Sequence, residues 1–451
     1  MPPPPCVPQL CAGRLPPPWR APVTAAQPIA DSPLLTARTR AFVLQRPNLI
    51  AAAVCLMSFT GFWLAQRAAH VSMLDLLVYR AEGWAARNGE GLYDMRVTYA
   101  RLPATYPPFA ALLFMPLTWL EVGQMRDLAV VGNLVLLVTL VHLSLRLLGR
   151  PCRLPRVAVS LAVAAVAVWC EPVWTTLRYG QINLLLAVLV LWDLTRRNGH
   201  RWAGFGTGLA AGIKLTPALF AVFLALAGIA LGWQRLRRDG SAWNVHLRRS
   251  AVAAATFAGT VVLTALVLPH DSRRFWTQVV FAADRVGHGE ETGNQSLRGF
   301  LARALHDAAP GNPWLISAAV AGCAGLAVAV AAQLAGDRLP HASAWAAVAC
   351  AVTALLISPV SWSHHWVWGV PMVLLLAAEA TRRRDARWAA GAVLSGVLFS
   401  SYLPWLVPHG GLRPELHQSG GEMLLSAVYP ALGAAFLAVA GAVSVRALRG
   451  R

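Results

Sequence analysis

Long runs of apolar residues, separated by short polar segments, recur along most of this 451-residue chain. A helix needs about 17 to 25 mostly apolar residues to cross a bilayer. The runs predict spans near 48–68, 127–147, 156–175, 180–195, 203–232, 250–269, 314–335, 341–358, 364–380, 387–404 and 423–446. The pattern therefore predicts an all-α polytopic membrane protein with about 11 or 12 transmembrane helices.

One predicted span, 203–232, is interrupted by the sequence GIKLTP, in which a glycine and a proline flank Lys214. We expect two short half-helices on either side of this break. A lysine at membrane depth costs about 2.5 to 3.5 kcal/mol on insertion scales, which makes Lys214 a candidate functional residue. Its ammonium group would suit a phosphate. The alternative is that its long side chain only reaches to the membrane interface.

Composition agrees with the pattern, because 57% of the residues are hydrophobic and only 13% are charged, against roughly 25% charged residues in soluble domains. The seven cysteines are odd in number and form no C-x-x-C pair. That argues against a disulfide framework and against a zinc site.

Residues 1–47 have a different composition, because they are rich in proline and lack a long apolar run. We interpret them as a disordered cytoplasmic tail, with a ligand for a proline-binding module as the alternative. Residues 48–451 are predicted to form a single transmembrane domain.

The distribution of charge predicts the topology. If the N-terminus is cytoplasmic, the segments on the cytoplasmic side carry 25 of the 39 Lys and Arg residues and 6 of the 20 acidic residues. The opposite side is then neutral, and the positive-inside rule accounts for the whole net charge of +19. Nucleic-acid binding is not needed to explain the basic composition.

This topology requires that the apolar segment YPPFAALLFMPLTWL (106–120) does not cross the membrane. Prolines interrupt it and it is short, so we expect a helix lying against the outer face. The alternative, a short true span, would reverse the orientation of residues 121–155.

The sequence DLLVYRAEGWAARNGEGLYD (75–94) follows the first span. At helical spacing Asp75, Tyr79 and Glu82 share one stripe, and apolar residues form another. We expect an amphipathic helix at the membrane interface, with its carboxylates toward a cavity. The alternative for Asp75 is a favourable interaction with the helix dipole.

Amides and an arginine mark two further segments predicted on the outer side. In RYGQIN, Gln181 and Asn183 either face the interface or bind a polar ligand. In ETGNQSLRGF, Asn294, Gln295 and Arg298 could seat sugar hydroxyls or a phosphate. The alternative there is a helix cap by Asn294 or the neighbouring serine.

The sequence SPVSWSHHWVW (358–368) lies between two apolar runs. Adjacent residues of a helix point in different directions, so His364 and His365 are not expected to ligate one metal ion, and we predict no metal site. A histidine here could donate a hydrogen bond to an anion. Trp366 and Trp368 fit a belt of aromatic residues at the membrane interface.

Taken in order, DLLVYRAEGWAARNGEGLYD, YPPF, GQIN, GIKLTP, NQSLRG and SPVSWSHHWVW form a specific set. Over residues from about 45 to 410 the chain resembles the polyprenol-phosphate-sugar-dependent glycosyltransferases of the GT-C superfamily. Within them it resembles glycosyltransferase family 87, the actinobacterial α-mannosyltransferases.

The resemblance implies a GT-C fold with juxtamembrane helices in the first extracytoplasmic loop, in the plasma membrane. It implies inverting transfer of mannose from polyprenyl-phosphate-mannose to a glycolipid or lipoglycan of the cell envelope, without metal or cofactor. Asp75 is the expected general base. The expected ligands of the donor phosphate are Lys214, His364, His365 and Arg298. The expected sugar-binding residues are Tyr79, Tyr106, Gln181, Asn183, Asn294 and Gln295.

Two alternatives remain open from the sequence. Relatives on the same scaffold transfer arabinofuranose from decaprenyl-phosphate-arabinose. A flippase or transporter of lipid-linked sugars is the other, although the sequence shows no internal repeat and its polar clusters fall on one side of the membrane.

Overall fold

The computed structural model describes residues 46–149, 154–237 and 241–450. The predicted tail, 1–47, lies almost wholly outside the described residues. Within the described ranges the chain forms helices and two isolated β-bridges, with no strand. This confirms the predicted all-α class.

The first half of the described chain contains α2 (Pro47–Ala68), α3 (Leu74–Asn88), α4 (Pro108–Phe114), η1 (Met115–Trp119), α5 (Val122–Leu148), α6 (Arg156–Ala167), α7 (Glu171–Tyr179), α8 (Asn183–Leu194), α9 (Phe205–Ile213), α10 (Ala218–Leu236) and α11 (Val245–Val267), where η marks a 3₁₀ helix. The second half contains α12 (Pro269–Thr277), η2 (Val279–Phe281), η3 (Ala283–Val286), α13 (Leu297–Ala304), α14 (Gly311–Ala335), η4 (Gly336–Arg338), α15 (Ala342–Ile357), η5 (Ser363–Trp368), α16 (Gly369–Arg383), α17 (Ala386–Ser400), η6 (Leu403–Leu406), η7 (Pro414–His417), α18 (Gly420–Ser426) and α19 (Val428–Arg449).

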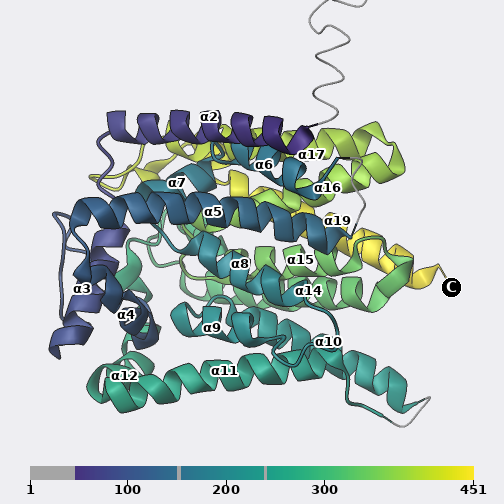
Figure 1. The fold of residues 1–451 in the computed structure, drawn as a ribbon, viewed down its shortest axis with the longest axis horizontal. Helices are drawn as coiled ribbons and strands as arrows, with labels where there is room; N and C mark the ends of the chain where they lie inside the picture. The colour runs from purple at the N-terminus through teal and green to yellow at the C-terminus, as the bar shows by residue number, and fades with distance from the viewer. Residues whose placement is uncertain (1–45, 150–153, 238–240, 451) are drawn as a thin grey trace, which may run out of the picture. The chain divides into compact units, whose positions relative to one another are not determined.

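The long helices lie roughly side by side in Figure 1, and α3, α4 and α12 gather at one end of them. Helix α15 packs between α14, α19 and α5, while α2 packs on α6, and α9 and α10 pack on α11. Helix α15 is the most deeply buried, since all its residues from Ala344 to Leu356 are in the core. It occupies the centre of the bundle.

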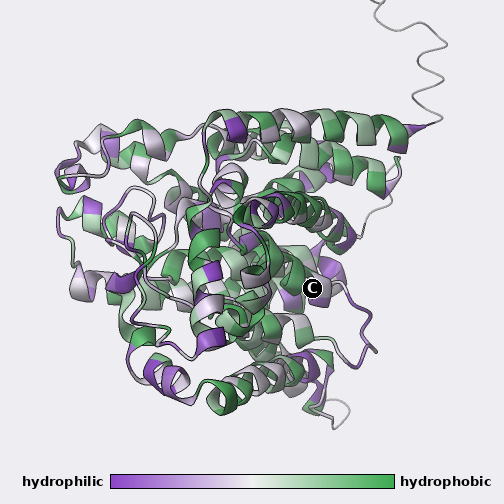
Figure 2. Cartoon of the chain, turned by 60° about the vertical axis from the view of Figure 1, so that its left-hand side comes forward, coloured by the Kyte–Doolittle hydropathy of each residue, from purple (hydrophilic) through white to green (hydrophobic). Residues whose placement is uncertain are grey.

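Six helices among the described residues are long and apolar enough to cross a membrane, or seven if the pair α6 and α7 counts as one broken span. Their outward faces are apolar, as Leu56, Val131, Leu266 and Ile316 show with more than half of each side chain exposed. Figure 2 shows hydrophobic residues along the helices and hydrophilic residues mainly in the connections. The chain is a multi-pass membrane protein.

The other predicted spans correspond to shorter helices. Helices α8, α15 and α17 are apolar but have 12, 16 and 15 residues. Helices α6 and α7 meet at an angle of 79°, with a proline in the first turn of α7. Fewer helices reach the full length of a crossing than the eleven or twelve predicted, because breaks near polar segments divide the apolar runs.

The segments predicted to lie outside the membrane on one side contact one another. Helix α3 packs on α4, η1 and α7, α12 contacts α4, and α7 contacts η5. The short helices α4 and η1 occupy the segment 106–120, for which the sequence predicted a helix outside the bilayer core. The fold therefore brings the candidate residues of α3, α7 and η5 to one end of the bundle.

Candidate active site

Asp75 lies in the first turn of α3, at the N-terminal end of the helix. Met73 precedes it in the left-handed conformation, with φ of 52°, and turns the chain from α2 into this helix. Tyr79 and Glu82 are buried on the same helix, whereas Asp75 stays partly exposed. The predicted helix and its polar stripe are confirmed.

The junction of α7 and α8 lies directly against the start of α3. Gly180 ends α7 with φ of 69°, and a Cβ added there would lie 2.7 Å from Cβ of Leu76. A side chain would therefore be excluded by both the backbone conformation and the neighbouring helix. The glycine allows the next residue, Gln181, to reach the side chain of Asp75.

The side-chain amide of Gln181 forms hydrogen bonds with three polar side chains, those of Asp75, Tyr79 and Tyr106. Its Nε2 donates to Oδ2 of Asp75 at 2.7 Å. Its Oε1 accepts from the hydroxyls of Tyr79 at 2.7 Å and Tyr106 at 3.1 Å. The two tyrosine hydroxyls lie 3.1 Å apart.

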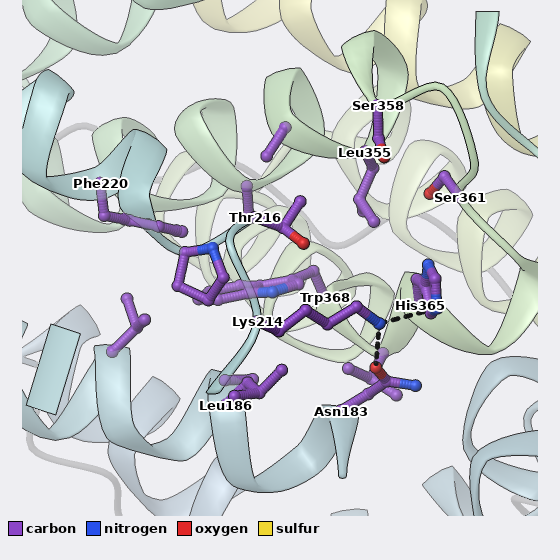
Figure 3. A pocket seen from close by; sticks show the side chains of 16 residues that line it. Asn183, Leu186, Lys214, Thr216, Phe220, Leu355, Ser358, Ser361, His365 and Trp368 are labelled. Carbon is purple, nitrogen blue, oxygen red and sulfur yellow. Dashed lines mark hydrogen bonds between the residues drawn. The ribbon is translucent and has the colours of Figure 1, made fainter. Parts of the chain in front are cut away.

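Lys214 lies at the break between α9 and α10, where the backbone is extended with φ of −149°. This confirms the predicted break, although α10 is a full-length helix of 19 residues and only α9 is short. The Nζ atom lies 3.0 Å from Nε2 of His365 and donates to Oδ1 of Asn183 at 3.4 Å (Figure 3). It also donates to the hydroxyl of Tyr106 at 3.4 Å, which links Lys214 to the Asp75 side of the cluster.

The two histidines belong to η5, a 3₁₀ helix that precedes α16. Their rings are 4.8 Å apart and perpendicular, at 89°, so they point in different directions as predicted. His365 faces Lys214, while His364 is buried with its ring against Tyr179. The carbonyl oxygen of His364 accepts from Thr176 at 2.8 Å and from Asn183 at 3.1 Å, which fixes the turn against α7 and α8.

A cavity of about 50 Å³, partly open to solvent, extends from this cluster between α8, α10, α15 and η5. Its polar end holds Lys214, Asn183 and His365, with Ser358 and Ser361 opposite. The rest of its lining is mostly apolar, from residues such as Leu186, Val190, Phe220, Leu355 and Trp368. The arrangement joins a polar, cationic group to an apolar slot.

Burial changes the protonation of the carboxyls of α3, which lies outside the long apolar helices. It raises the pKa of Asp75 to about 6, against the lowering effects of the hydrogen bond from Gln181 and of the Lys214 charge. Burial raises the pKa of Glu82 to about 8, in part opposed by a hydrogen bond from the backbone of Thr105. Near neutral pH the partly exposed Asp75 is thus ionised, and Glu82 is mainly neutral.

Three predicted site residues do not contact this cluster. The amide of Asn294 is occupied by the backbone of Gly289, Pro359 and Ser361. The amide of Gln295 likewise bonds to the backbone of Thr292, Ser426 and Tyr429. The Arg298 guanidinium lies over the ring of Trp314, at 5.5 Å. The predicted roles of these three residues stay predictions.

The segment 294–296 instead connects two parts of the fold. Ser296 caps α13, since its Oγ accepts from the backbone N–H of Gly299 at 3.2 Å, as the capping alternative predicted. The backbone of Gln295 donates to the Ser361 carbonyl at 2.7 Å. Gly293 accepts from the backbone of Ser363 at 2.8 Å. These bonds hold the η5 turn in place.

The expectation of an interfacial belt is wrong for Trp366 and Trp368. Both are buried, with 1% and 9% of their surface exposed. Trp366 packs against Tyr429, and Trp368 stacks on Phe220 at 5.3 Å. Helices α10 and α19 cover these indoles, which a sequence pattern alone does not reveal.

Sequence reasoning missed Glu171, which is fully buried at the start of α7. Its Oε1 accepts from Thr175, Ser363 and Trp405, at 2.8, 2.7 and 2.9 Å, and its Oε2 accepts from the hydroxyl of Tyr429 at 2.8 Å. A single acidic residue inside a predicted span was the available signal.

Arg303 was missed as well. It is 1% exposed, and its guanidinium donates to Ser426 and to the backbone carbonyls of Glu290, Glu291 and Asn294. Its amphipathic helical context resembled an ordinary surface helix. Among the described residues no three His, Cys, Asp or Glu side chains are grouped so that they could hold a metal ion. That no metal takes part in the reaction stays a prediction.

The fold and this cluster define a multi-pass membrane protein with a polar site at one end of a mostly apolar cavity. Residues 104–359 match the family model described as glycosyltransferase family 87. The chain belongs to glycosyltransferase family 87 and is a membrane glycosyltransferase.

Curated relatives agree with this assignment. A polyprenol-phosphate-mannose-dependent alpha-(1-2)-phosphatidylinositol pentamannoside mannosyltransferase of Mycobacterium tuberculosis (strain CDC 1551 / Oshkosh) is 36% identical over 72% of this chain and 69% of its own length. A polyprenol-phosphate-mannose-dependent alpha-(1-2)-phosphatidylinositol mannoside mannosyltransferase of M. tuberculosis (strain ATCC 25618 / H37Rv) is 33% identical over 73% of this chain and 76% of its own.

A pentamannoside mannosyltransferase of the same description from Mycolicibacterium smegmatis is 34% identical over 79% of this chain and 81% of its own length. No solved structure matches the chain significantly.

Proposed function

We propose that this protein transfers mannose from polyprenyl-phosphate-mannose to a phosphatidylinositol mannoside or a related lipoglycan. The transfer takes place on the extracytoplasmic side of the plasma membrane, with the N-terminus in the cytoplasm. Donor and acceptor class follow the names of the relatives, all of which specify alpha-(1-2) transfer. The side of the membrane follows the distribution of basic residues.

The observation that carries the proposal is the meeting of Asp75 and Lys214. Hydrogen bonds through Gln181 and Tyr106 connect them, and Lys214 lines the polar end of an apolar cavity. A polyprenyl-phosphate sugar has the matching parts: an apolar chain, an anionic phosphate and a sugar. The cavity suits the chain, Lys214 suits the phosphate, and the sugar would lie toward Asp75.

The reaction is a single displacement. The acceptor hydroxyl oxygen bonds to the anomeric carbon of mannose as the bond from that carbon to the phosphate oxygen breaks, which inverts the anomeric configuration. The hydroxyl proton passes to Asp75, and the polyprenyl phosphate leaves with the bonding electron pair. Asp75 is partly exposed and ionised near neutral pH, so it can accept this proton.

Negative charge grows on the phosphate as it leaves, and fixed donors lower the free energy of that state. Lys214 and His365 would contact it together, because Nζ of Lys214 lies 3.0 Å from Nε2 of His365. His364 acts through the position of the turn, because its own ring faces Tyr179. Tyr79, Tyr106 and Asn183 would order the sugar, and no metal or cofactor takes part.

The test is transfer by the purified chain in lipid vesicles, with radiolabelled polyprenyl-phosphate-mannose and decaprenyl-phosphate-arabinose offered in parallel to phosphatidylinositol mannosides. We expect label from mannose in an elongated glycolipid, removable by an α-mannosidase. Arabinose transfer without mannose transfer would overturn the donor assignment. Movement of intact donor across the vesicle without transfer would favour a flippase.

A further inference from the structure

We propose that Gln181 is a positioning residue for Asp75: its amide holds the carboxylate in the orientation that takes the acceptor proton. This inference rests on the proposed function, because it assigns Gln181 a part in the same reaction. It replaces the expectation that Gln181 binds sugar.

Hydrogen bonds on both ends determine the orientation of the Gln181 amide. An ionised carboxylate only accepts, so the atom that faces Asp75 must be the amide nitrogen. The oxygen then faces the hydroxyls of Tyr79 and Tyr106, which both donate to it. A rotation of the amide by 180° would place its oxygen against the carboxylate oxygen and lose the hydrogen bond to Asp75, because both atoms only accept.

The backbone under this amide is also fixed. The Gln181 N–H donates to the carbonyl of Thr176 at 2.9 Å, and Gly180 packs against Leu76 of α3. Only 6% of the Gln181 surface is exposed. The residue is therefore held between α7 and α3 and offers a sugar little accessible surface.

Other groups around Asp75 act on its charge but do not hold its oxygen. Lys214 lowers the pKa of Asp75 through its charge. Glu82 on the same helix and the three tyrosines Tyr79, Tyr106 and Tyr179 interact with it electrostatically. The hydrogen bond from Gln181 is the direct contact that fixes both the orientation and the charge of the carboxylate.

The test is the pH dependence of mannose transfer by Gln181→Met and Gln181→Asn in vesicles. The first conserves size and removes the amide, and the second retracts the amide by one methylene. Loss of a hydrogen bond to a carboxylate shifts its pKa upward by about one unit. The acid limb of the pH–rate profile should therefore shift to higher pH by about one unit. This shift lowers the rate about tenfold at pH 5 and about twofold at pH 7.

The matched control is Gln66→Met in α2, because the Gln66 side chain is also buried but has no hydrogen-bond partner among the described residues. Its acid limb should coincide with that of the natural chain. An unmoved limb in the Gln181 variants, with a raised KM for either substrate, would overturn the proposal in favour of sugar binding. An unmoved limb with only a lower unfolding temperature would overturn it in favour of a structural role.

A second measurement does not depend on transfer activity. The carboxyl infrared band of Asp75, identified by its loss in Asp75→Asn, should titrate at higher pH in the Gln181 variants than in the natural chain. If the chain transfers no mannose but this shift appears, the contact is correct and the proposed function fails. If transfer occurs and the band titrates unchanged, only the positioning role fails. Should Gln181→Met not fold, Gln181→Asn decides by the same criteria.

Discussion

Two carboxylates, Glu171 and Asp75, lie near the two ends of the short helix α7, and they differ in burial and in how many hydrogen bonds they accept. Glu171, at the start of the helix, is fully buried and accepts from four side chains of α7, η5, η6 and α19. Asp75, beyond its end, is partly exposed and, within the described part of the chain, accepts one side-chain hydrogen bond, from Gln181. The carboxylate of Glu171 is therefore saturated with hydrogen bonds, whereas that of Asp75 is unsaturated and keeps oxygen lone pairs that can accept further hydrogen bonds.

This difference favours a structural role for Glu171 and a chemical role for Asp75. A carboxylate that already accepts four hydrogen bonds has little capacity left to bind a substrate group. A carboxylate with one donor, a raised pKa and an opening to solvent can exchange a proton. The number of satisfied lone pairs therefore distinguishes the two acids better than burial or helix position does.

The largest expected effect comes from removing the unsaturated carboxylate. Asp75→Asn should lower kcat by about 10²- to 10⁴-fold, the usual contribution of a general base. Its unfolding temperature should stay close to that of the natural chain, because the change is isosteric and retains a polar contact with Gln181. Single-turnover transfer in vesicles measures the rate, and near-normal transfer would exclude Asp75 as the base.

Removing the saturated carboxylate should act mainly on stability. Glu171→Leu leaves the Ser363, Trp405 and Tyr429 donors without a partner, at a cost of about 3 kcal/mol in the free energy of unfolding. Thermal unfolding in detergent measures it. Glu171→Gln is the control and should lose less, because its amide oxygen still accepts two or three of these bonds. A stable Glu171→Leu protein without transfer activity would contradict the scaffold role.

Loss of the cation should affect use of the donor. Lys214→Met removes the charge and preserves most of the stem beside Trp368, so we expect kcat/KM for polyprenyl-phosphate-mannose to fall about 10- to 100-fold. The acceptor KM should change little. Donor titrations at fixed acceptor give the answer, and an unchanged donor response would mean that Lys214 only reaches toward the interface.

The smallest effect concerns pH. The Asp75 carboxyl, with a pKa of about 6, must be ionised to accept a proton, so activity is full above that value and is lost as pH falls through it. Below pH 6 the rate should fall about tenfold per unit. A kcat/KM profile on vesicles buffered from pH 4.5 to 8 measures the limb, with unfolding temperature followed in parallel. A kcat/KM that does not change with pH over this range would contradict a base with a pKa of about 6.

The sequence predicted best what depends on local spacing and on the cost of polarity in lipid. The stripe of Asp75 and Tyr79 follows from helical periodicity, and the break at Lys214 from a lysine beside Gly212 and Pro217. The pattern also predicted an all-α membrane protein correctly. Each of these depends on neighbours within a few residues.

Tertiary contacts were out of reach. Whether Asn294 is free for a ligand depends on Gly289, Pro359 and Ser361, and the last two are more than sixty residues away in sequence. Glu171 is saturated by residues as far away as Tyr429. The burial of Trp366 likewise requires helices that fold around it. An amide, an acid or an indole can serve a structural or a functional role, and its tertiary contacts determine which of the two it has.

The short helix α7 sets a fixed spacing within the site. At its centre Thr176 bonds to the carbonyl of His364, and two residues past its end Gln181 bonds to Asp75. The backbone from Thr176 to Gln181 therefore sets the separation between Asp75, the proposed base, and the η5 turn that carries His365. A substitution that lengthens or unwinds α7 would therefore change the distance between Asp75 and the η5 turn.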